Sequence, residues 1–206
     1  MFAELEFEAR AGLRGAGVAY ARAAVRAAAV PGVDRGGGRG RRLDMELGYL
    51  LRPAGRRQAA AFARAHARAC EALRREVVGA LRGLRHEVRG LGEAGRNVYV
   101  SLFAVEPGAA AQEAHADAAE RARGSYTTVI VPLTSGPGEG TTEFVTLSGD
   151  SRAPRAGRAY AFDGRSVHFG GANGSRAWRC ALCVVVCKGS DPNRVAGGCR
   201  SWAGHF

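Results

Sequence analysis

The sequence predicts an α+β protein that forms a single domain, residues 1–206, with three regions. Helical periodicity dominates residues 1–96, short apolar runs separated by turn signals dominate residues 97–188, and residues 189–206 form a C-terminal tail. A chain of 206 residues is long enough for one well-buried domain and short for two. We therefore expect a helical N-terminal support region followed by a β-rich core.

The longest helical pattern spans residues 56–89. Pro53 and Gly55 mark its start, and Gly90 and Gly92 mark its exit. Its apolar face is formed by side chains that recur at steps of three and four. These are Phe62, His66, Ala69, Leu73, Val77, Leu81 and Leu84.

A second, weaker helix is expected over residues 18–29, ended by Pro31 and Gly32. Residues 36–42 are rich in glycine and arginine, which predicts a flexible basic linker. Strands are expected to begin near residues 97–103.

Turn signals divide the last part of the β-rich region. Residues 159–169 indicate a strand, a tight turn at Asp163-Gly164 and a second strand. Asn173-Gly174 supplies the turn chemistry of another hairpin, and residues 178–186 form an almost continuous apolar run suited to a buried strand.

Three side chains in this region have the chemistry of an iron site. His115 and Asp117 are two residues apart, so in a strand they share a face and lie about 7 Å apart. His168 comes later, on a segment that can fold back opposite them. Two imidazoles and one carboxylate are the facial triad of non-haem iron(II) oxygenases. A His-x-Asp pair by itself also fits a solvated strand edge, so the prediction depends on the residues after His168.

Arg179 stands at the start of the last apolar run. A guanidinium at the start of a buried strand needs an anionic partner, and its planar fork matches a carboxylate. Arg176 is the competing candidate, but it lies nearer the turn, where we expect it to be solvated.

The order of these residues resembles that of the Fe(II)/2-oxoglutarate-dependent dioxygenases, and the resemblance is closest to their prolyl-4-hydroxylase-like branch. It covers residues 97–188, where residues 126–134 resemble the strand after His-x-Asp and residues 138–144 resemble the next Gly-rich turn. The resemblance implies a double-stranded β-helix (jelly-roll), with the N-terminal helices packed outside the barrel. It also implies Fe(II), 2-oxoglutarate as co-substrate and ascorbate as an additional cofactor.

The resemblance assigns the roles residue by residue. His115, Asp117 and His168 are the catalytic metal ligands, and Arg179 binds the far carboxylate of 2-oxoglutarate. Members of this branch often place a tyrosine on the strand after His-x-Asp to contact the co-substrate, whereas the corresponding inward position here is Pro132. Thr128 is the candidate to replace it, with Tyr126 as the alternative.

The activity implied is hydroxylation, with a protein side chain such as proline as the expected substrate. A nucleic-acid-directed oxygenase or demethylase is the alternative, because the formal charge is +11 and the pI is near 10.4. Lys188 is the only lysine, however, and GC-biased coding also produces abundant Arg, Ala and Gly. The basic segments 39–42 and 151–155 either line a substrate entrance or are solvated. A small metabolite also remains a candidate substrate.

Two further classes keep the fold but not the reaction. A non-catalytic β-helix binding module would lose a ligand, which the intact triad argues against. A cupin-type metalloprotein usually offers His-x-His at the first motif, where this chain has Asp117.

The other reactive residues predict no second site. There are five cysteines, an odd number that does not form a disulfide framework, and Cys180 and Cys183 fall on opposite faces of a strand. His66 and His86 are expected to be packing or surface residues. The N-terminus is acidic and the longest apolar run is far shorter than the ~20 residues of a membrane span, so we expect a soluble intracellular protein, cytoplasmic or nuclear, without a membrane partner.

Overall fold

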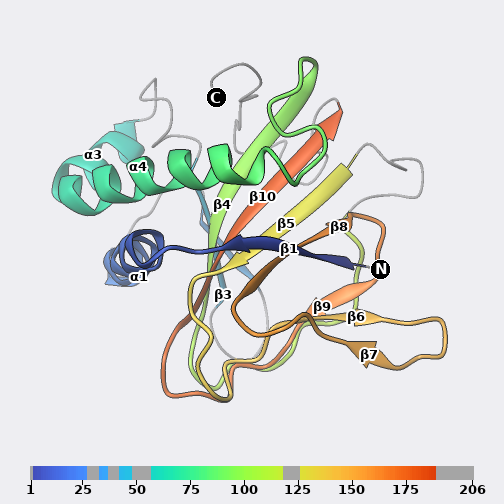
Figure 1. Ribbon diagram of the computed structural model, residues 1–206. Helices are drawn as coiled ribbons and strands as arrows, with labels where there is room; N and C mark the ends of the chain where they lie inside the picture. The colour runs from blue at the N-terminus through green and yellow to red at the C-terminus, as the bar shows by residue number, and fades with distance from the viewer. Residues whose placement is uncertain (1, 27–32, 37–41, 48–56, 118–125, 189–206) are drawn as a thin grey trace.

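The computed structural model describes residues 2–26, 33–36, 42–47, 57–117 and 126–188 (Figure 1). The elements follow one another in a mixed order that ends in strands. They are β1 (Phe2–Glu8), α1 (Ala11–Arg26), β2 (Val33–Gly36), β3 (Arg42–Glu46), α3 (Arg57–Ala65), α4 (Ala67–Leu84), β4 (Arg96–Val105), β5 (Tyr126–Pro132), β6 (Thr142–Val145), β7 (Ser151–Arg152), β8 (Arg158–Asp163), β9 (His168–Gly170) and β10 (Arg179–Lys188).

The strands form two antiparallel sheets. The larger sheet has seven strands in the order β1-β8-β5-β10-β4-β3-β2, and the smaller has three in the order β7-β6-β9. The sheets pack through aromatic side chains, with the ring of Phe144 on β6 4.9 Å from that of Phe162 on β8. The chain therefore crosses repeatedly between two antiparallel sheets, as in a jelly-roll.

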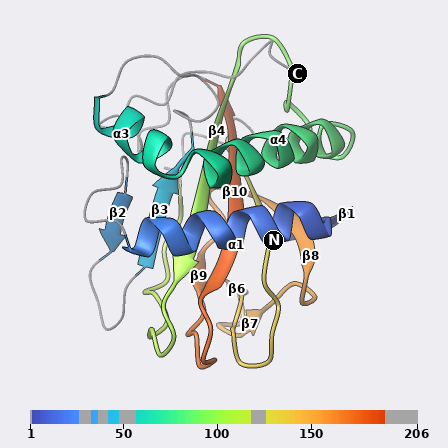
Figure 2. The same ribbon diagram turned by 90° about the vertical axis from the view of Figure 1, so that its left-hand side faces the viewer.

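The central strand β10 pairs with β4 on one side and β5 on the other over most of its length. Because side chains alternate along a strand, each strand of this sheet contributes to two separate clusters. Leu102, Leu182 and Val184 belong to the cluster that includes helices α1 and α4, and these two helices lie side by side over the sheet (Figure 2). Tyr99, Cys183 and Val185 belong to the cluster on the other face. We call this second face of the seven-stranded sheet the site face.

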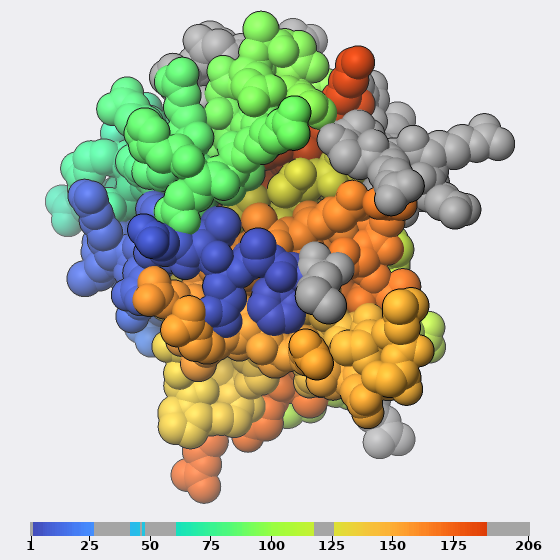
Figure 3. All heavy atoms as spheres, turned by 45° about the vertical axis from the view of Figure 1, so that its right-hand side comes forward, coloured from blue at the N-terminus to red at the C-terminus, as the bar shows by residue number. Residues whose placement is uncertain are grey.

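The helical expectation for the N-terminal region is only partly correct. Strands begin at Phe2, not near residue 97, because β1 pairs with β8 and β3 pairs with β4. Figure 3 shows the N-terminal segment, in blue, lying against the orange segment that contains β8. The signal in β1 is a short alternation of apolar residues with glutamates, and Leu5 is its one buried residue. The expected linker also differs, since Gly36 belongs to β2 and Arg42 to β3, while residues 37–41 lie outside the described residues.

The helix boundaries also differ from the expectation. The long helix is divided into α3 and α4 at His66, whose φ of −124° is not helical and whose ring centroid lies 4.7 Å from that of Phe62 in a tilted contact. It ends at Leu84 rather than at residue 89. The first helix begins at Ala11, seven residues before the expected start, and the expected end at residues 27–29 lies outside the described residues, as does the tail 189–206.

Two expected hairpins are connections between the sheets. Asp163-Gly164 leads from β8 in the large sheet to β9 in the small one, and Asn173-Gly174 leads back to β10. Asn173 is fully buried, and its amide donates to the carbonyls of Val105 (2.9 Å) and Ala177 (2.8 Å). The Asn173 side chain thus holds the loop against the end of β4. In the expected hairpin turn, this side chain would instead be exposed to solvent. No helix among the described residues is long and apolar enough to span a membrane.

Candidate active site

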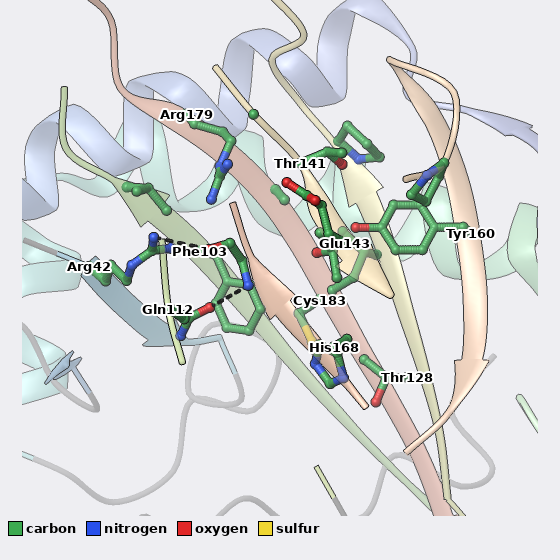
Figure 4. A pocket seen from close by; sticks show the side chains of 18 of the residues that line it. Arg42, Phe103, Gln112, Thr128, Thr141, Glu143, Tyr160, His168, Arg179 and Cys183 are labelled. Carbon is green, nitrogen blue, oxygen red and sulfur yellow. Dashed lines mark hydrogen bonds between the residues drawn. The ribbon is translucent and has the colours of Figure 1, made fainter. Parts of the chain in front are cut away.

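A large pocket lies on the site face, with a volume of about 1180 Å³. Its floor consists of the site-face residues of β3, β4, β5, β8 and β10, and its walls come from β6, β9 and residues 110–117 (Figure 4). The volume exceeds that of most small-ligand pockets, which reach about 1,000 Å³. The pocket can therefore hold more than one small molecule.

Backbone pairing brings the two candidate histidines together. The N–H of His115 donates to the carbonyl of His168, and the N–H of His168 donates to the carbonyl of His115, both at 2.8 Å. Gln112 extends this contact, because its N–H donates to the carbonyl of Gly170 (2.9 Å) and its side-chain oxygen accepts from the N–H of Gly170 (3.0 Å). His115 therefore lies in an isolated β-bridge rather than in a long strand. The two imidazole rings lie 4.6 Å apart.

The third candidate ligand completes a compact set of donor atoms. Asp117 Oδ1 is 3.8 Å from His115 Nε2 and 3.6 Å from His168 Nε2. The ligand atoms of the three side chains all lie within 4.8 Å of one another, and this is the one such group among the described residues. The sequence prediction that these residues meet is therefore confirmed by the geometry.

The surroundings of the three side chains fit a metal ion. The Nδ1 atoms contact the carbonyls of Glu113 (2.9 Å) and Ser166 (2.8 Å), an arrangement in which each Nδ1 carries the proton and each Nε2 keeps its lone pair. Thr128 Oγ1 donates to Asp117 Oδ2 at 2.8 Å, which leaves Oδ1 directed at the histidines. Burial lowers the pKa of His168 and outweighs the opposing charge of Asp117. The neutral imidazole that results is the form that binds metals.

Arg179 lies on the same pocket floor. Its Nη1 donates to the carbonyl of Glu139 at 2.8 Å, and burial lowers its pKa against the opposing influence of Tyr160 and Glu139. No carboxylate in the described part of the chain forms an ion pair with it. Arg176 is exposed and does not line the pocket.

The neighbouring predicted positions also face the pocket. Pro132, Thr128 and Tyr126 line it from β5, in agreement with the inward position assigned to Pro132. The hydroxyl of Thr128 is directed at Asp117, so the structure gives it a partner that sequence reasoning did not name. Its contact with the co-substrate stays a prediction.

Sequence reasoning missed one pocket residue and gave another the wrong local structure. Tyr160 on β8 is 1% exposed, burial raises its pKa to about 12, and its phenol interacts with Thr141, Thr142 and the charge of Arg179. Arg42 lies on β3 rather than in a linker, and it lines the pocket, which is the first of the two alternatives expected for segment 39–42. The apolar strand at 159–162 was visible, but the face to which Tyr160 points depends on pairing with β5, which no local pattern specifies.

The cysteines behave as expected from strand alternation. Cys180 packs in the cluster that contains the helices, and Cys183 packs in the cluster on the site face. None of the four described cysteines forms a disulfide.

A scan against protein-family models and a search of curated proteins find no match. Solved structures do match. AviO1 from Streptomyces viridochromogenes Tue57 has a TM-score of 0.57 at 16% identity, covering 93% of this chain and 91% of its own. A second match is SnoN, a non-heme, alpha-ketoglutarate-dependent epimerase from nogalamycin biosynthesis, in complex with Fe3+, alpha-ketoglutarate and nogalamycin RO. It has a TM-score of 0.58 at 15% identity, and the match covers 91% of this chain and 78% of the SnoN chain.

A prolyl hydroxylase in complex with a hypoxia-inducible-factor peptide fragment from Trichoplax adhaerens has a TM-score of 0.60 at 16% identity, covering 91% of this chain and 83% of its own. The chain has the fold of the 2-oxoglutarate-dependent oxygenases. Prolyl hydroxylases are among the solved structures that share this fold.

Proposed function

We propose that this protein is an Fe(II)- and 2-oxoglutarate-dependent dioxygenase that hydroxylates its substrate. The observation that supports this most strongly is the convergence of His115, Asp117 and His168 in a pocket whose floor also carries Arg179. A non-catalytic binding module has no need of such a set of donors. The shared fold with SnoN and the prolyl hydroxylases supports the same reaction class.

In this proposal His115 Nε2, His168 Nε2 and Asp117 Oδ1 hold the metal. Bound Fe(II) supplies the open coordination positions at which the 2-oxo acid and oxygen react. The carbonyls of Glu113 and Ser166 hold the two rings in the ligating tautomer. Thr128 fixes the Asp117 carboxylate through its second oxygen, the kind of supporting contact on which ligand geometry depends.

The distal carboxylate of 2-oxoglutarate binds Arg179 in this proposal. The guanidinium is already oriented by the carbonyl of Glu139 and retains donors for a carboxylate. Tyr160, which lines the same pocket from β8, provides the hydroxyl that the branch usually supplies from the position of Pro132. The helices α1 and α4 support this site from outside the barrel by fixing the opposite face of the same strands.

For the substrate, we propose a protein side chain such as proline. The likeness to a prolyl hydroxylase bound to a peptide supports this, as does a pocket with room beyond the co-substrate. The charge of +11 makes nucleic acid the second candidate.

The activity test measures succinate formed from 2-oxoglutarate with Fe(II), ascorbate and oxygen, in the presence of proline-containing peptides or oligonucleotides. We expect succinate to depend on both Fe(II) and 2-oxoglutarate and to rise with one substrate class. Arg176→Ala serves as the control, because Arg176 is exposed outside the pocket. Succinate formation that His168→Ala leaves unchanged would refute the proposed function.

A further inference from the structure

Arg42 occupies a defined place relative to Arg179. In the pairing registers Arg42 lies opposite Val105 on β4, and Val105 lies opposite Arg179 on β10. Residues that pair across a sheet point to the same face, and strands are about 4.8 Å apart, so the two arginines arise about 10 Å apart on the site face. In Figure 4 both lie on the side of the pocket away from Tyr160.

One end of the Arg42 guanidinium is tethered to the backbone around the metal ligands. Its Nη2 donates to the carbonyls of Ala110, Gly170 (3.3 Å) and Gly171 (3.3 Å). All three acceptors are neutral. Among the described residues, none of the ion pairs joins a carboxylate to Arg42, and no carboxylate is among the causes that shift its pKa.

The environment of this second cation is unfavourable without an anion. Burial, and then the charge of Arg179, lower the pKa of Arg42 to about 10. The distal carboxylate of 2-oxoglutarate compensates the charge of Arg179 in the proposed function, but nothing described compensates Arg42. A guanidinium whose Nη2 is held by carbonyls still has N–H groups on Nε and Nη1, and each of these can donate a charge-assisted hydrogen bond to one oxygen of a carboxylate.

We propose that Arg42 binds a carboxylate of the primary substrate, so that the hydroxylated compound is an acid. This inference rests on the proposed function, because it assigns the rest of the same pocket. The carboxylate comes either from an acidic side chain next to the target residue of a peptide or from a small organic acid. Both present the same group to Arg42.

The test uses the full chain loaded with Fe(II) and saturating 2-oxoglutarate under nitrogen, so that Arg179 is already occupied. Calorimetric titration compares two matched pairs of probes. One pair is phenylacetate and phenylacetamide, and the other is the capped tetrapeptides Ala-Pro-Glu-Ala and Ala-Pro-Gln-Ala. Each pair is measured on the parent, on Arg42→Gln, on Arg42→Lys and on Arg176→Gln as the matched arginine control. Affinity for 2-oxoglutarate is measured on the same proteins and on Arg179→Gln, and an oligothymidylate is titrated as a further probe.

We expect the parent to bind the acid of at least one pair about 10- to 100-fold more tightly than its amide, which is the range for a charge-assisted contact. Arg42→Gln should remove this preference, Arg42→Lys should keep part of it, and Arg176→Gln should keep all of it. The pair that shows the preference identifies the source of the carboxylate. Affinity for 2-oxoglutarate should stay within about twofold in the Arg42 variants, since a general disturbance of the metal site would lower it.

Three results would overturn the inference. In the first, neither acid is preferred although 2-oxoglutarate binds, which leaves the proposed function intact. In the second, Arg42→Gln weakens 2-oxoglutarate binding as strongly as Arg179→Gln, which places Arg42 in the co-substrate site. In the third, an oligothymidylate binds more tightly than either acid and depends on Arg42, which makes a nucleic-acid phosphate the ligand. Failure of the parent to bind 2-oxoglutarate would instead refute the proposed function.

Discussion

The two faces of the seven-stranded sheet are built by alternate residues of the same strands and have different tasks. On the face toward α1 and α4, residues such as Leu102, Leu182 and Val184 are fully buried among other apolar side chains. On the site face, aromatic residues alternate with Arg179, Thr128 and other polar groups around the pocket. The helix-covered face stabilises the fold and holds the strands in place. The site face can therefore carry buried polar groups, although burying them costs free energy of folding.

The largest expected effect comes from removing a metal ligand on the site side. His168→Ala or His115→Ala should abolish iron binding and succinate formation, because alanine offers no lone pair to the metal. His86→Ala is the control, because His86 is exposed in the turn after α4 and does not line the pocket. Iron content after anaerobic loading and succinate yield are measured together. Normal iron content and turnover in His168→Ala would contradict the assignment.

The next largest effect is expected at the co-substrate anchor. Arg179→Ala should leave iron binding nearly intact but weaken 2-oxoglutarate binding by two to three orders of magnitude, since losing one partner of a buried ion pair costs about 3–5 kcal/mol. Lysine should restore only part of the loss, because it lacks the planar fork. Arg176→Ala should have no such effect. The reverse pattern would move the anchor to Arg176.

A smaller effect is expected where the site face supports the ligands. Thr128→Val keeps the shape of the side chain but removes the donor to Asp117 Oδ2, and contacts of this kind are worth about 10- to 100-fold in metal affinity or activity. Thr127→Val, one residue away on the same strand and pointing to the opposite face, is the control. Equal iron affinity and turnover in both variants would show that Asp117 is positioned without Thr128.

The smallest effect is expected from single core substitutions, which compare the two faces of the sheet most directly. Val184 and Val185 are neighbours on β10, nearly fully buried, and belong to opposite clusters. Replacing either with alanine should lower the free energy of unfolding by about 2 kcal/mol. Val185→Ala alone should also reduce turnover at saturating co-substrate, because Val185 pairs with Thr128. Denaturant unfolding and succinate yield of the two variants test this, and an equal loss of turnover in both would remove the distinction between the faces.

Much of this site could be predicted from the sequence, because its parts are short and local. The spacing of His115 and Asp117, the turn before His168 and the position of Arg179 at the start of an apolar run are properties of neighbouring residues. The structure confirms that the triad residues converge and that Arg179 rather than Arg176 lines the pocket.

The rest depends on register between strands that are far apart in the chain. Arg42 reaches the pocket because β3 pairs with β4 more than fifty residues later, and Tyr160 faces it because of its pairing with Ile130. A shift of one residue would turn either side chain to the other face. The glycines and arginines around Arg42 predicted a linker that could line a substrate entrance, but not a strand. The glutamates of β1 gave no strand signal, and its partner β8 lies about 150 residues away in the chain.

The central claim is that one pocket binds Fe(II) and 2-oxoglutarate together. Absorption titration under nitrogen tests it most directly, because a 2-oxo acid bound to Fe(II) through two oxygens gives a visible metal-to-ligand band. We predict that the band appears only when Fe(II) and 2-oxoglutarate are both present, that it saturates at one equivalent of each per chain, and that it is lost in His168→Ala. A parent protein that shows no band at saturating Fe(II) and 2-oxoglutarate would contradict the account.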